Sequence, residues 1–336
     1  MKKKLFSLAL AAIMTLSLAA CGAKEEAPAE APAETPAETP AEAPAAETYN
    51  VGICQLVQHV ALDAATQGFM DALNEALPGQ VNFDNQNASN DIPLCSTIVG
   101  QFVAADVDLI MANATPALQA ASAATTEIPI LGTSITEYGV ALEIDGFDGT
   151  VGGNLSGTSD LAPLDQQAAM LKEWFPDAKS VGLIYCSAEA NSQYQVDVVK
   201  AELEALGYAC ELYSFSDSND LAAVTESAVV NSDVIYVPTD NTVAANTGII
   251  DNICRPAKVP VIAGEEGICS GCGVATLSIS YYDLGVATGK MAAKILTGEA
   301  DVSEMPIEYA PATPKYNADI CADLGLTAPE GYVAIG

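Results

Sequence analysis

The chain has 336 residues, and half of them are apolar, so a large hydrophobic core can form. Its formal net charge is −32, with only 12 Lys and Arg residues. Nucleic-acid binding needs clustered basic side chains that neutralise phosphates, so this composition argues against a nucleic-acid partner. An acidic surface of this kind favours solubility and repulsion between copies of the molecule.

Residues 1–20 are typical of a secretion signal. Three lysines at positions 2–4 precede an apolar run, 5–18, which is too short to span a membrane comfortably. The run ends in LAAC, and this sequence, closing at Cys21, resembles the lipobox of bacterial lipoproteins. The resemblance implies cleavage before Cys21, lipid on its thiol, and a protein held outside the cytoplasm on the bacterial cell membrane. The alternative is a plain secreted protein.

Residues 21–48 are expected to form a tether. This segment repeats Pro, Ala and Glu. Regular Pro blocks a continuous helix, repeated Glu repels itself, and too little apolar surface is available for folding.

The remaining chain contains two similar halves. The first half runs through YNVGICQL, GFMDALNEALPG, VDLIMANATPALQAA and EIPILGTSI, and the second through AKSVGLIYCS, VDVVKAELEALGY, SDVIYVPTDNTVAAN and KVPVIAGEEG. The offset is roughly constant at about 130 residues, which indicates a duplicated domain rather than short repeats. A stretch rich in Gly, Ser, Thr and Pro, residues 154–167, joins the halves and predicts a hinge over 157–163.

Strands and helices alternate in the predicted order. In the first half we expect strands at 51–56, 81–83, 109–112 and 128–131, and helices at 62–77, 94–104 and 116–124. The second half repeats this order from 181 to 263. This alternation predicts an α/β fold of two lobes, each a parallel sheet flanked by helices.

A helix at 282–297 has no counterpart between the halves, so we expect it to pack back on the first lobe. The predicted domains are therefore an N-terminal lobe of 49–155 plus about 278–304, and a C-terminal lobe of 156–277 plus about 305–336. Several crossings of this kind make a hinge that bends without letting the lobes separate.

The order of several motifs resembles one known family. VGICQLVQHVALDAATQGF, NLSGTSDLAPLDQQ, YVPTDNTVAAN and DLGVATGKMAAKILTGE resemble the substrate-binding lipoproteins of ABC importers, and within them the tryptophan/tyrosine-import type. The resemblance covers about 49–336. It implies a periplasmic-binding-protein fold of the leucine/ribose-binding type, a monomer without catalysis or cofactor, and delivery of ligand to a membrane permease with its ATPase. A sensing partner of a membrane receptor is an alternative role.

Ligands of parallel α/β sheets bind beyond the carboxyl ends of the strands, and the repeat predicts these ends in both lobes. The first lobe offers hydroxyls, amides and helix N-termini, which suit a carboxylate, and the second offers acids, which suit an ammonium group. Together they predict a zwitterionic ligand such as an amino acid, with an aromatic one favoured by the resemblance. Asp160 is expected either to cap the following helix or to touch the ligand. The candidate ligand-binding residues are Gln55, His59, Asn87, Thr115, Thr133, Ser134, Ser159, Asp160, Glu189, Asn191, Asp240, Asn241 and Glu266.

The sequence gives little indication of a catalytic site or a metal site. His59 is the only histidine, and no nucleophile and orienting acid stand at useful spacing from it. Cys269 and Cys272 have CxxC spacing, but they are expected in a Gly-rich late loop, and a zinc site would need about four ligands. A loop disulfide or free thiols are expected, with an extracytoplasmic thiol redox enzyme as the weaker alternative. No phosphate-binding loop is present in the sequence, so no nucleotide site is predicted.

Overall fold

A computed structural model describes residues 48–335 of the chain. The expected signal peptide, lipidated Cys21 and most of the tether lie outside these described residues. Within them, no helix is both long enough and apolar enough to cross a membrane.

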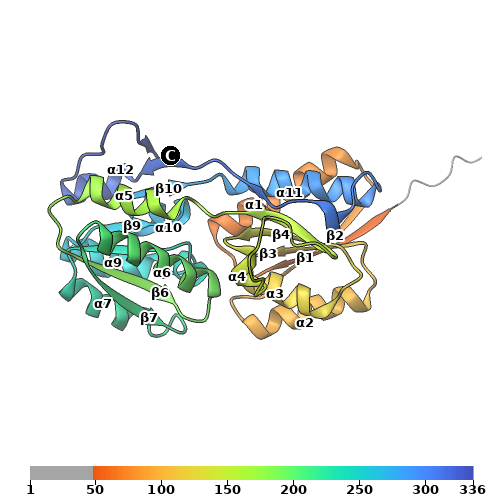
Figure 1. Cartoon of the computed structure of the whole chain (residues 1–336), viewed down its shortest axis with the longest axis horizontal. Helices are drawn as coiled ribbons and strands as arrows, with labels where there is room; N and C mark the ends of the chain where they lie inside the picture. The colour runs from red at the N-terminus through yellow and green to blue at the C-terminus, as the bar shows by residue number, and fades with distance from the viewer. Residues whose placement is uncertain (1–47, 336) are drawn as a thin grey trace, which may run out of the picture. The chain divides into compact units, whose positions relative to one another are not determined.

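Two separate sheets organise the described residues, as the sequence predicts (Figure 1). The first sheet has six strands in the order β11-β5-β4-β3-β1-β2, and every neighbouring pair is parallel. Its strands are β1 (Tyr49–Gln55), β2 (Val81–Asn87), β3 (Leu109–Asn113), β4 (Ile130–Ile135), β5 (Leu155–Ser159) and β11 (Glu308–Tyr309). Strand β3 is buried at all five positions, as expected for a parallel strand covered on both faces.

The second sheet has seven strands in the order β13-β12-β10-β9-β8-β6-β7. They are β6 (Ser180–Cys186), β7 (Ala209–Phe215), β8 (Val234–Val237), β9 (Val261–Ala263), β10 (Ala275–Ser278), β12 (Thr313–Tyr316) and β13 (Val333–Ala334). Strand β12 runs antiparallel to β10, so this sheet is mainly, not wholly, parallel. Both sheets belong to one compact unit.

Helices cover both faces of the first sheet. They are α1 (Val60–Ala76), α2 (Ile92–Ala104), α3 (Thr115–Ala124), α4 (Tyr138–Ala141) and α11 (Tyr281–Leu296). Phe69 of α1 and Met291 of α11 share one apolar cluster with strands β1 and β3. Phe102 of α2 and Leu118 of α3 belong to the cluster that contains Ile110 of β3.

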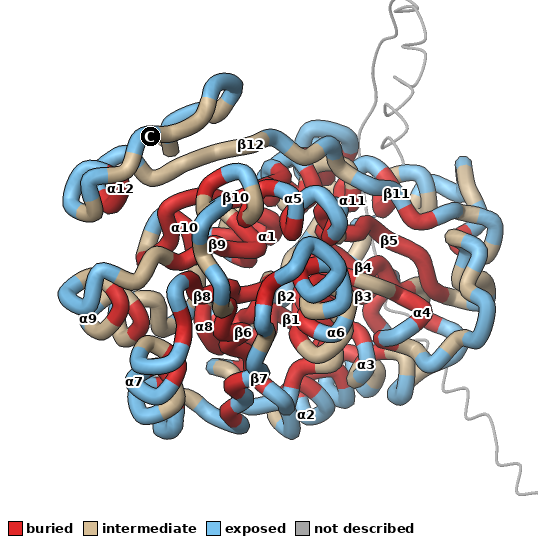
Figure 2. Tube along the Cα trace, turned by 60° about the vertical axis from the view of Figure 1, so that its left-hand side comes forward, coloured by how far each residue is buried: buried red, intermediate tan, exposed pale blue. Residues whose placement is uncertain are grey.

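The second sheet is covered in the same way. Its helices are α5 (Leu164–Trp174), α6 (Ala190–Ala205), α7 (Leu221–Asn231), α8 (Asn241–Ala244), α9 (Thr247–Ala257), α10 (Glu266–Cys272) and α12 (Ala318–Leu324). A short 3-10 helix, η1 (Val302–Glu304), belongs to the first lobe and precedes β11. Trp174 and Val199 belong to the cluster that includes Leu183, and Ile250 and Ile268 to the cluster that includes Ile235. The buried strands and the exposed outer turns of α7 and α9 can be followed in Figure 2.

Glycines bring α11 close to α1. A Cβ atom on Gly285 would lie 2.0 Å from the backbone oxygen of Ala65, and one on Gly68 would lie 2.1 Å from that of Tyr282. No larger residue fits at either position without separating the helices. The two helices therefore pack backbone to backbone, which fixes the start of α11 beside the start of α1.

The strands place the crossings between the sheets at 160–163, 279–280 and 310–312. Strand β5 extends the first sheet to Ser159, and β11 adds Tyr309 to its edge. The first sheet thus extends a few residues beyond the expected lobe boundaries at 155 and about 305. The sequence NLSGTS looked like linker because it is rich in Gly, Ser and Thr, but its hydroxyls are buried and paired, as in the 2.9 Å contact between Thr158 and Thr288.

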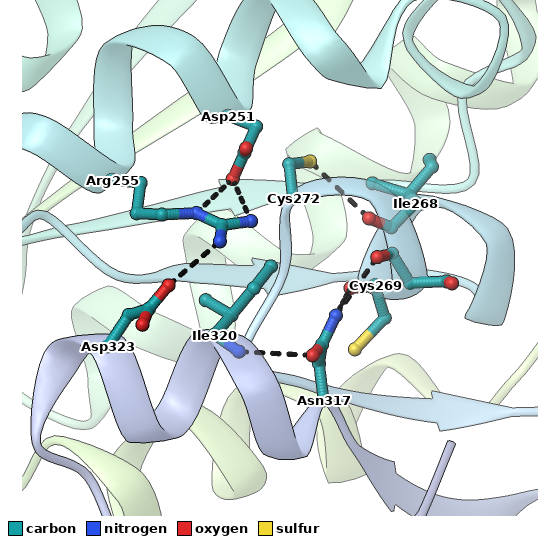
Figure 3. A network of polar contacts seen from close by, with 9 residues as sticks. Asp251, Arg255, Ile268, Cys269, Cys272, Asn317, Ile320 and Asp323 are labelled. Atoms are coloured by element: carbon teal, nitrogen blue, oxygen red, sulfur yellow. Dashed lines mark hydrogen bonds and ion pairs between the residues drawn. The ribbon is translucent and has the colours of Figure 1, made fainter. Parts of the chain in front are cut away.

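Polar contacts fasten the C-terminal helix α12 to α9 and α10 (Figure 3). Arg255 of α9 contacts Asp251 in its own helix and Asp323 of α12 at 2.9 Å. Asn317 caps α12 and donates from Nδ2 to the backbone oxygens of Cys269 and Ser270. These bonds hold the returning chain against the second sheet.

Candidate functional site

A small cavity lies where the carboxyl ends of strands from both sheets meet. The first sheet and its helices contribute His59, Leu62, Ser134, Thr136, Asp160 and Tyr281 to the lining. The second contributes Asn191, Thr239, Asp240, Asn241, Ala244 and Glu265. The free volume is only about 10 Å³, which is room for about one water.

Four buried polar atoms in this lining have no hydrogen-bond partner among the described residues. They are Nδ1 of His59, Oγ of Ser134, Oδ1 of Asp160 and Oδ1 of Asn191. An unpaired buried polar group costs about 1–3 kcal/mol, so such groups are few in native proteins. Their gathering from both lobes around one cavity indicates a binding site for a polar molecule.

Asp160 differs from the other acids of the cavity. It follows β5, is 4% exposed, and accepts a 2.8 Å hydrogen bond from the Tyr281 hydroxyl at Oδ2, whereas Oδ1 has no partner among the described residues. Burial raises the pKa of Asp160, and hydrogen bonds from Tyr281 and Thr136 oppose the rise. One carboxylate oxygen thus remains available to a ligand.

The two other acids of the cavity cap helices. Asp240 accepts from the backbone N–H of Cys186 at 2.7 Å and from that of Val243 at 2.9 Å. Glu265 accepts from the backbone N–H groups of Gly267 and Ile268. Burial raises the pKa of each acid to about 7 despite these bonds. A cation in the cavity would lower both values.

Ser134 sits in a strained part of the backbone. Its φ is 56°, in the left-handed region that few residues other than glycine adopt. The pairing of β4 with β5 shifts register between Gly132 and Ile135, which marks a local bulge. This bulge places the Ser134 hydroxyl at the cavity, a departure from strand geometry that the sequence alone did not predict.

Contacts between the lobes close around the start of α8. His59 Nε2 lies 3.3 Å from Asn241 Oδ1, and Asn90 Nδ2 donates to Thr242 Oγ1 at 3.1 Å. Glu189 holds this turn from within the second lobe, because it accepts from the backbone N–H groups of Asn241 and Thr242. Burial lowers the pKa of His59, so its ring is neutral near pH 7.

Of the predicted site residues, the structure brings six to the cavity: His59, Ser134, Asp160, Asn191, Asp240 and Asn241. Glu189 lies directly behind them.

The remaining predicted residues lie elsewhere. Gln55 is engaged by Asp63 and Thr66, Thr133 contacts Thr158, and Thr115 is buried in the first turn of α3. Ser159 donates to the backbone oxygen of Thr136, and Asn87 is exposed.

Glu266, one of the acids expected to hold the ammonium group, does not line this cavity. Its carboxylate pairs with Lys315 of β12 and faces a neighbouring cavity, so its charge is already matched. Glu266 was predicted to bind the ligand because it follows the carboxyl end of β9. It is the first residue of α10, and its side chain is not part of the lining of the first cavity. The pairing with Lys315, 49 residues along the chain, leaves no local signal.

Several lining residues were not among the predicted ones: Leu62, Thr136, Thr239, Ala244, Glu265 and Tyr281. Thr239 and Glu265 adjoin predicted residues at strand ends and could have been included by the same rule. Tyr281 could not have been predicted in this way, because it lies in α11, which has no counterpart between the two similar halves of the sequence.

The CxxC cysteines do not form an exposed reactive pair. Cys269 and Cys272 lie in α10 with at most 3% exposure, and burial raises the pKa of both thiols. Reactive cysteines need an accessible thiol with a lowered pKa, so this environment disfavours thiol redox chemistry. Among residues 48–335, no cluster of His, Cys, Asp or Glu is arranged to hold a metal ion.

The model of the family described as ABC transporter substrate binding protein matches residues 50–333, almost all of the described chain. The chain belongs to this family. Its members are extracytoplasmic binding proteins rather than enzymes, and the predicted class and fold are confirmed.

Two comparisons place this substrate-binding protein among its relatives. It is 37% identical over 261 residues to a tyrosine-binding protein of Clostridioides difficile, covering 77% of this chain and 75% of that one. It is also similar to a Streptococcus pneumonia ABC domain solved in complex with L-Trp, with 32% identity, a TM-score of 0.81, and coverage of 86% of this chain and all of that one.

A third structure has higher identity but lower structural similarity. The ligand-free, open structure of a substrate-binding protein with adhesive properties from Clostridium difficile is 37% identical, covers 86% of this chain and 99% of that one, and has a TM-score of 0.66. The substrate-binding protein described here therefore superposes better on the L-Trp complex than on this open structure.

Proposed function

We propose that this protein captures an aromatic amino acid, tyrosine or tryptophan, between its two lobes and delivers it to an ABC permease and its ATPase. One observation carries the proposal: four unpaired, buried polar atoms from both lobes surround a single cavity. A zwitterion supplies the donors and the acceptors that such atoms need. The ligands named for the two relatives support the aromatic class.

The free oxygen of Asp160 is the proposed partner of the ligand ammonium group. Asp240 and Glu265 have both oxygens occupied by backbone N–H groups, whereas Asp160 Oδ1 has no partner among residues 48–335. An ammonium group beside Asp160 would also offset the cost of burying three acids around one cavity.

The ligand carboxylate is assigned to the first lobe, as the sequence predicts, but to other residues. Helix α1 begins after His59 with no side-chain cap, so its first N–H groups favour an anion. The Ser134 hydroxyl lies in the same lining and has no partner among residues 48–335, so it and the N–H groups of α1 replace Thr115 and Thr133 as the proposed donors. The neutral His59 ring donates from Nε2 to Asn241 Oδ1, so its Nδ1 is an acceptor.

Several further properties that the sequence predicts for this protein belong to the same proposal. They are cleavage before Cys21, lipid on its thiol, anchoring to the cell membrane, a monomeric state and the absence of catalysis. An anchored binding protein stays close to the permease that it serves, which fits an acidic tether of 21–48.

A thermal-shift screen tests the function. The purified protein is heated with each of the common amino acids, with sugars and with polyamines. Ligand at a hundred times its dissociation constant adds about 2.7 kcal/mol of stability. We expect the largest shifts with L-tyrosine or L-tryptophan. A clear shift with a sugar or polyamine, and none with an amino acid, would contradict the proposal.

A further inference from the structure

A second cavity adjoins the first and shares two wall residues with it. Glu265 and Tyr281 line both cavities. The second has a volume of about 380 Å³, within the usual range of about 300–1,000 Å³ for small-molecule sites. An aromatic ring cannot fit in the roughly 10 Å³ of the first cavity, but it fits in the second.

Part of the wall of the second cavity is apolar. Ala61 and Ala64 of α1, Ile279 of the crossing segment and Ile335 near the C-terminus contribute to its wall. Tyr281 contributes to the walls of both cavities, and its hydroxyl donates to Asp160. The second cavity is therefore adjacent to the residues that hold Asp160, on the other side of a wall shared through Glu265 and Tyr281.

The wall also carries a matched ion pair. Glu266 and Lys315 contact each other there, with side chains that are 32% and 26% exposed. Ser278 Oγ also donates to Glu266. This pair supplies an acceptor and a donor to the wall of the second cavity, and it joins α10 to β12.

From this arrangement we propose that the second cavity holds the aromatic side chain of the bound amino acid, and that Glu266 and Lys315 select rings with a polar tip. A phenol can donate to Glu266 or accept from Lys315, and an indole N–H can donate to Glu266. A phenylalanine ring makes neither bond and leaves the ion pair partly desolvated. The inference rests on the proposed function and adds the residues that determine specificity.

The test compares L-tyrosine with L-phenylalanine by calorimetry. In the variant Glu266→Leu/Lys315→Met both charges are removed together, so neither is left unpaired. We expect tyrosine affinity to fall about three- to tenfold, the worth of one hydrogen bond at a partly exposed site. Phenylalanine affinity should stay the same or rise.

A matched control removes an ion pair far from both cavities. Lys200 and Glu204 form an exposed pair on α6, and Glu204→Leu/Lys200→Met should leave the tyrosine-to-phenylalanine ratio unchanged. An unchanged ratio in Glu266→Leu/Lys315→Met would overturn the inference while the function stands. Failure of the parent protein to bind any aromatic amino acid would overturn the function as well.

A second variant tests the place of the ring directly. Ala64 lines the second cavity only, and Ala64→Phe would fill part of it. We expect at least a tenfold loss of tyrosine affinity, with circular dichroism and the melting temperature of the free protein showing that the variant folds. A folded Ala64→Phe protein that binds tyrosine as tightly as the parent would place the ring elsewhere.

Discussion

Asp160 combines deep burial with an unsatisfied oxygen, and this combination separates it from the other acids of the cavity. Its partner Tyr281 comes from α11, on the far side of a crossing between the sheets. Oδ2 of the carboxylate is thus held by Tyr281, whereas Oδ1 has no partner among residues 48–335. In the free protein this arrangement costs stability, since a buried charge without a cation is unfavourable.

Replacing Asp160 with Asn tests this role. Asp160→Asn should weaken amino-acid binding by about 2–5 kcal/mol, because the buried ammonium group loses its counter-charge. The free variant should melt at the same temperature as the parent or higher. The control is Asp165→Asn, the same change at an exposed acid of α5. Calorimetry that finds parent-like affinity in Asp160→Asn would place the ammonium group elsewhere.

The raised pKa values of the buried acids predict a pH dependence. Asp240 and Glu265 have pKa values of about 7 in the folded protein, against 3.8 and 4.5 ordinarily. Protonation of these acids stabilises the free fold at low pH, and this contribution is lost as pH rises through about 7. The ammonium group needs ionised carboxylates, whereas it stays protonated itself over this range.

We therefore expect weaker binding at pH 5.5 than at pH 8, with protons released on binding near pH 6.5. Titrations in two buffers of different ionisation enthalpy measure that release. Equal affinity at both pH values, with no proton release, would show that these carboxylates do not respond to the ligand.

At the scale of elements, the first turn of α8 connects the lobes. Glu189 fixes its N–H groups from the second lobe, and His59 and Asn90 reach it from the first. The turn lies in the lining of the cavity through Asn241. Ligand binding and contact between the lobes are therefore coupled at one place.

Removal of the Asn90 side chain should loosen this contact. Asn90 has a φ of 63°, so Asn90→Gly deletes the bond to Thr242 without straining the backbone. We expect a two- to tenfold loss of affinity, about 0.5–1.5 kcal/mol, mainly as faster dissociation in stopped-flow kinetics. Ser89→Gly, at an adjacent exposed residue with a φ of 54°, is the control. Equal dissociation rates in the two variants would argue against the coupling.

Much of the element order could be predicted from the sequence, because buried strands such as β3 and amphipathic helices such as α1 carry clear periodic patterns. Strand β11 could not, since two exposed residues at a sheet edge have no pattern. The site was predicted in part. Asp240 and Asn241 were predicted because they follow the carboxyl end of a strand. The bulge at Ser134 and the pairing of Glu266 with Lys315 could not be predicted, because they depend on contacts between distant segments.

At the scale of the whole molecule, the crossings at 160–163, 279–280 and 310–312 form the proposed hinge. The described residues superpose better on the L-Trp complex than on the open relative. We expect the ligand-free protein in solution to open by rotation at these segments. Small-angle scattering should show a smaller radius of gyration with ligand, and an unchanged radius would count against the hinge.

The central claim, recognition of a zwitterionic aromatic amino acid, is tested most directly by calorimetry with three related compounds. These are L-tyrosine, its des-amino analogue and its decarboxylated analogue. We predict tight binding of L-tyrosine and losses of at least about thirtyfold for each analogue, since each leaves a buried polar group of the site unpaired. Equal binding of the des-amino analogue and L-tyrosine would contradict the account.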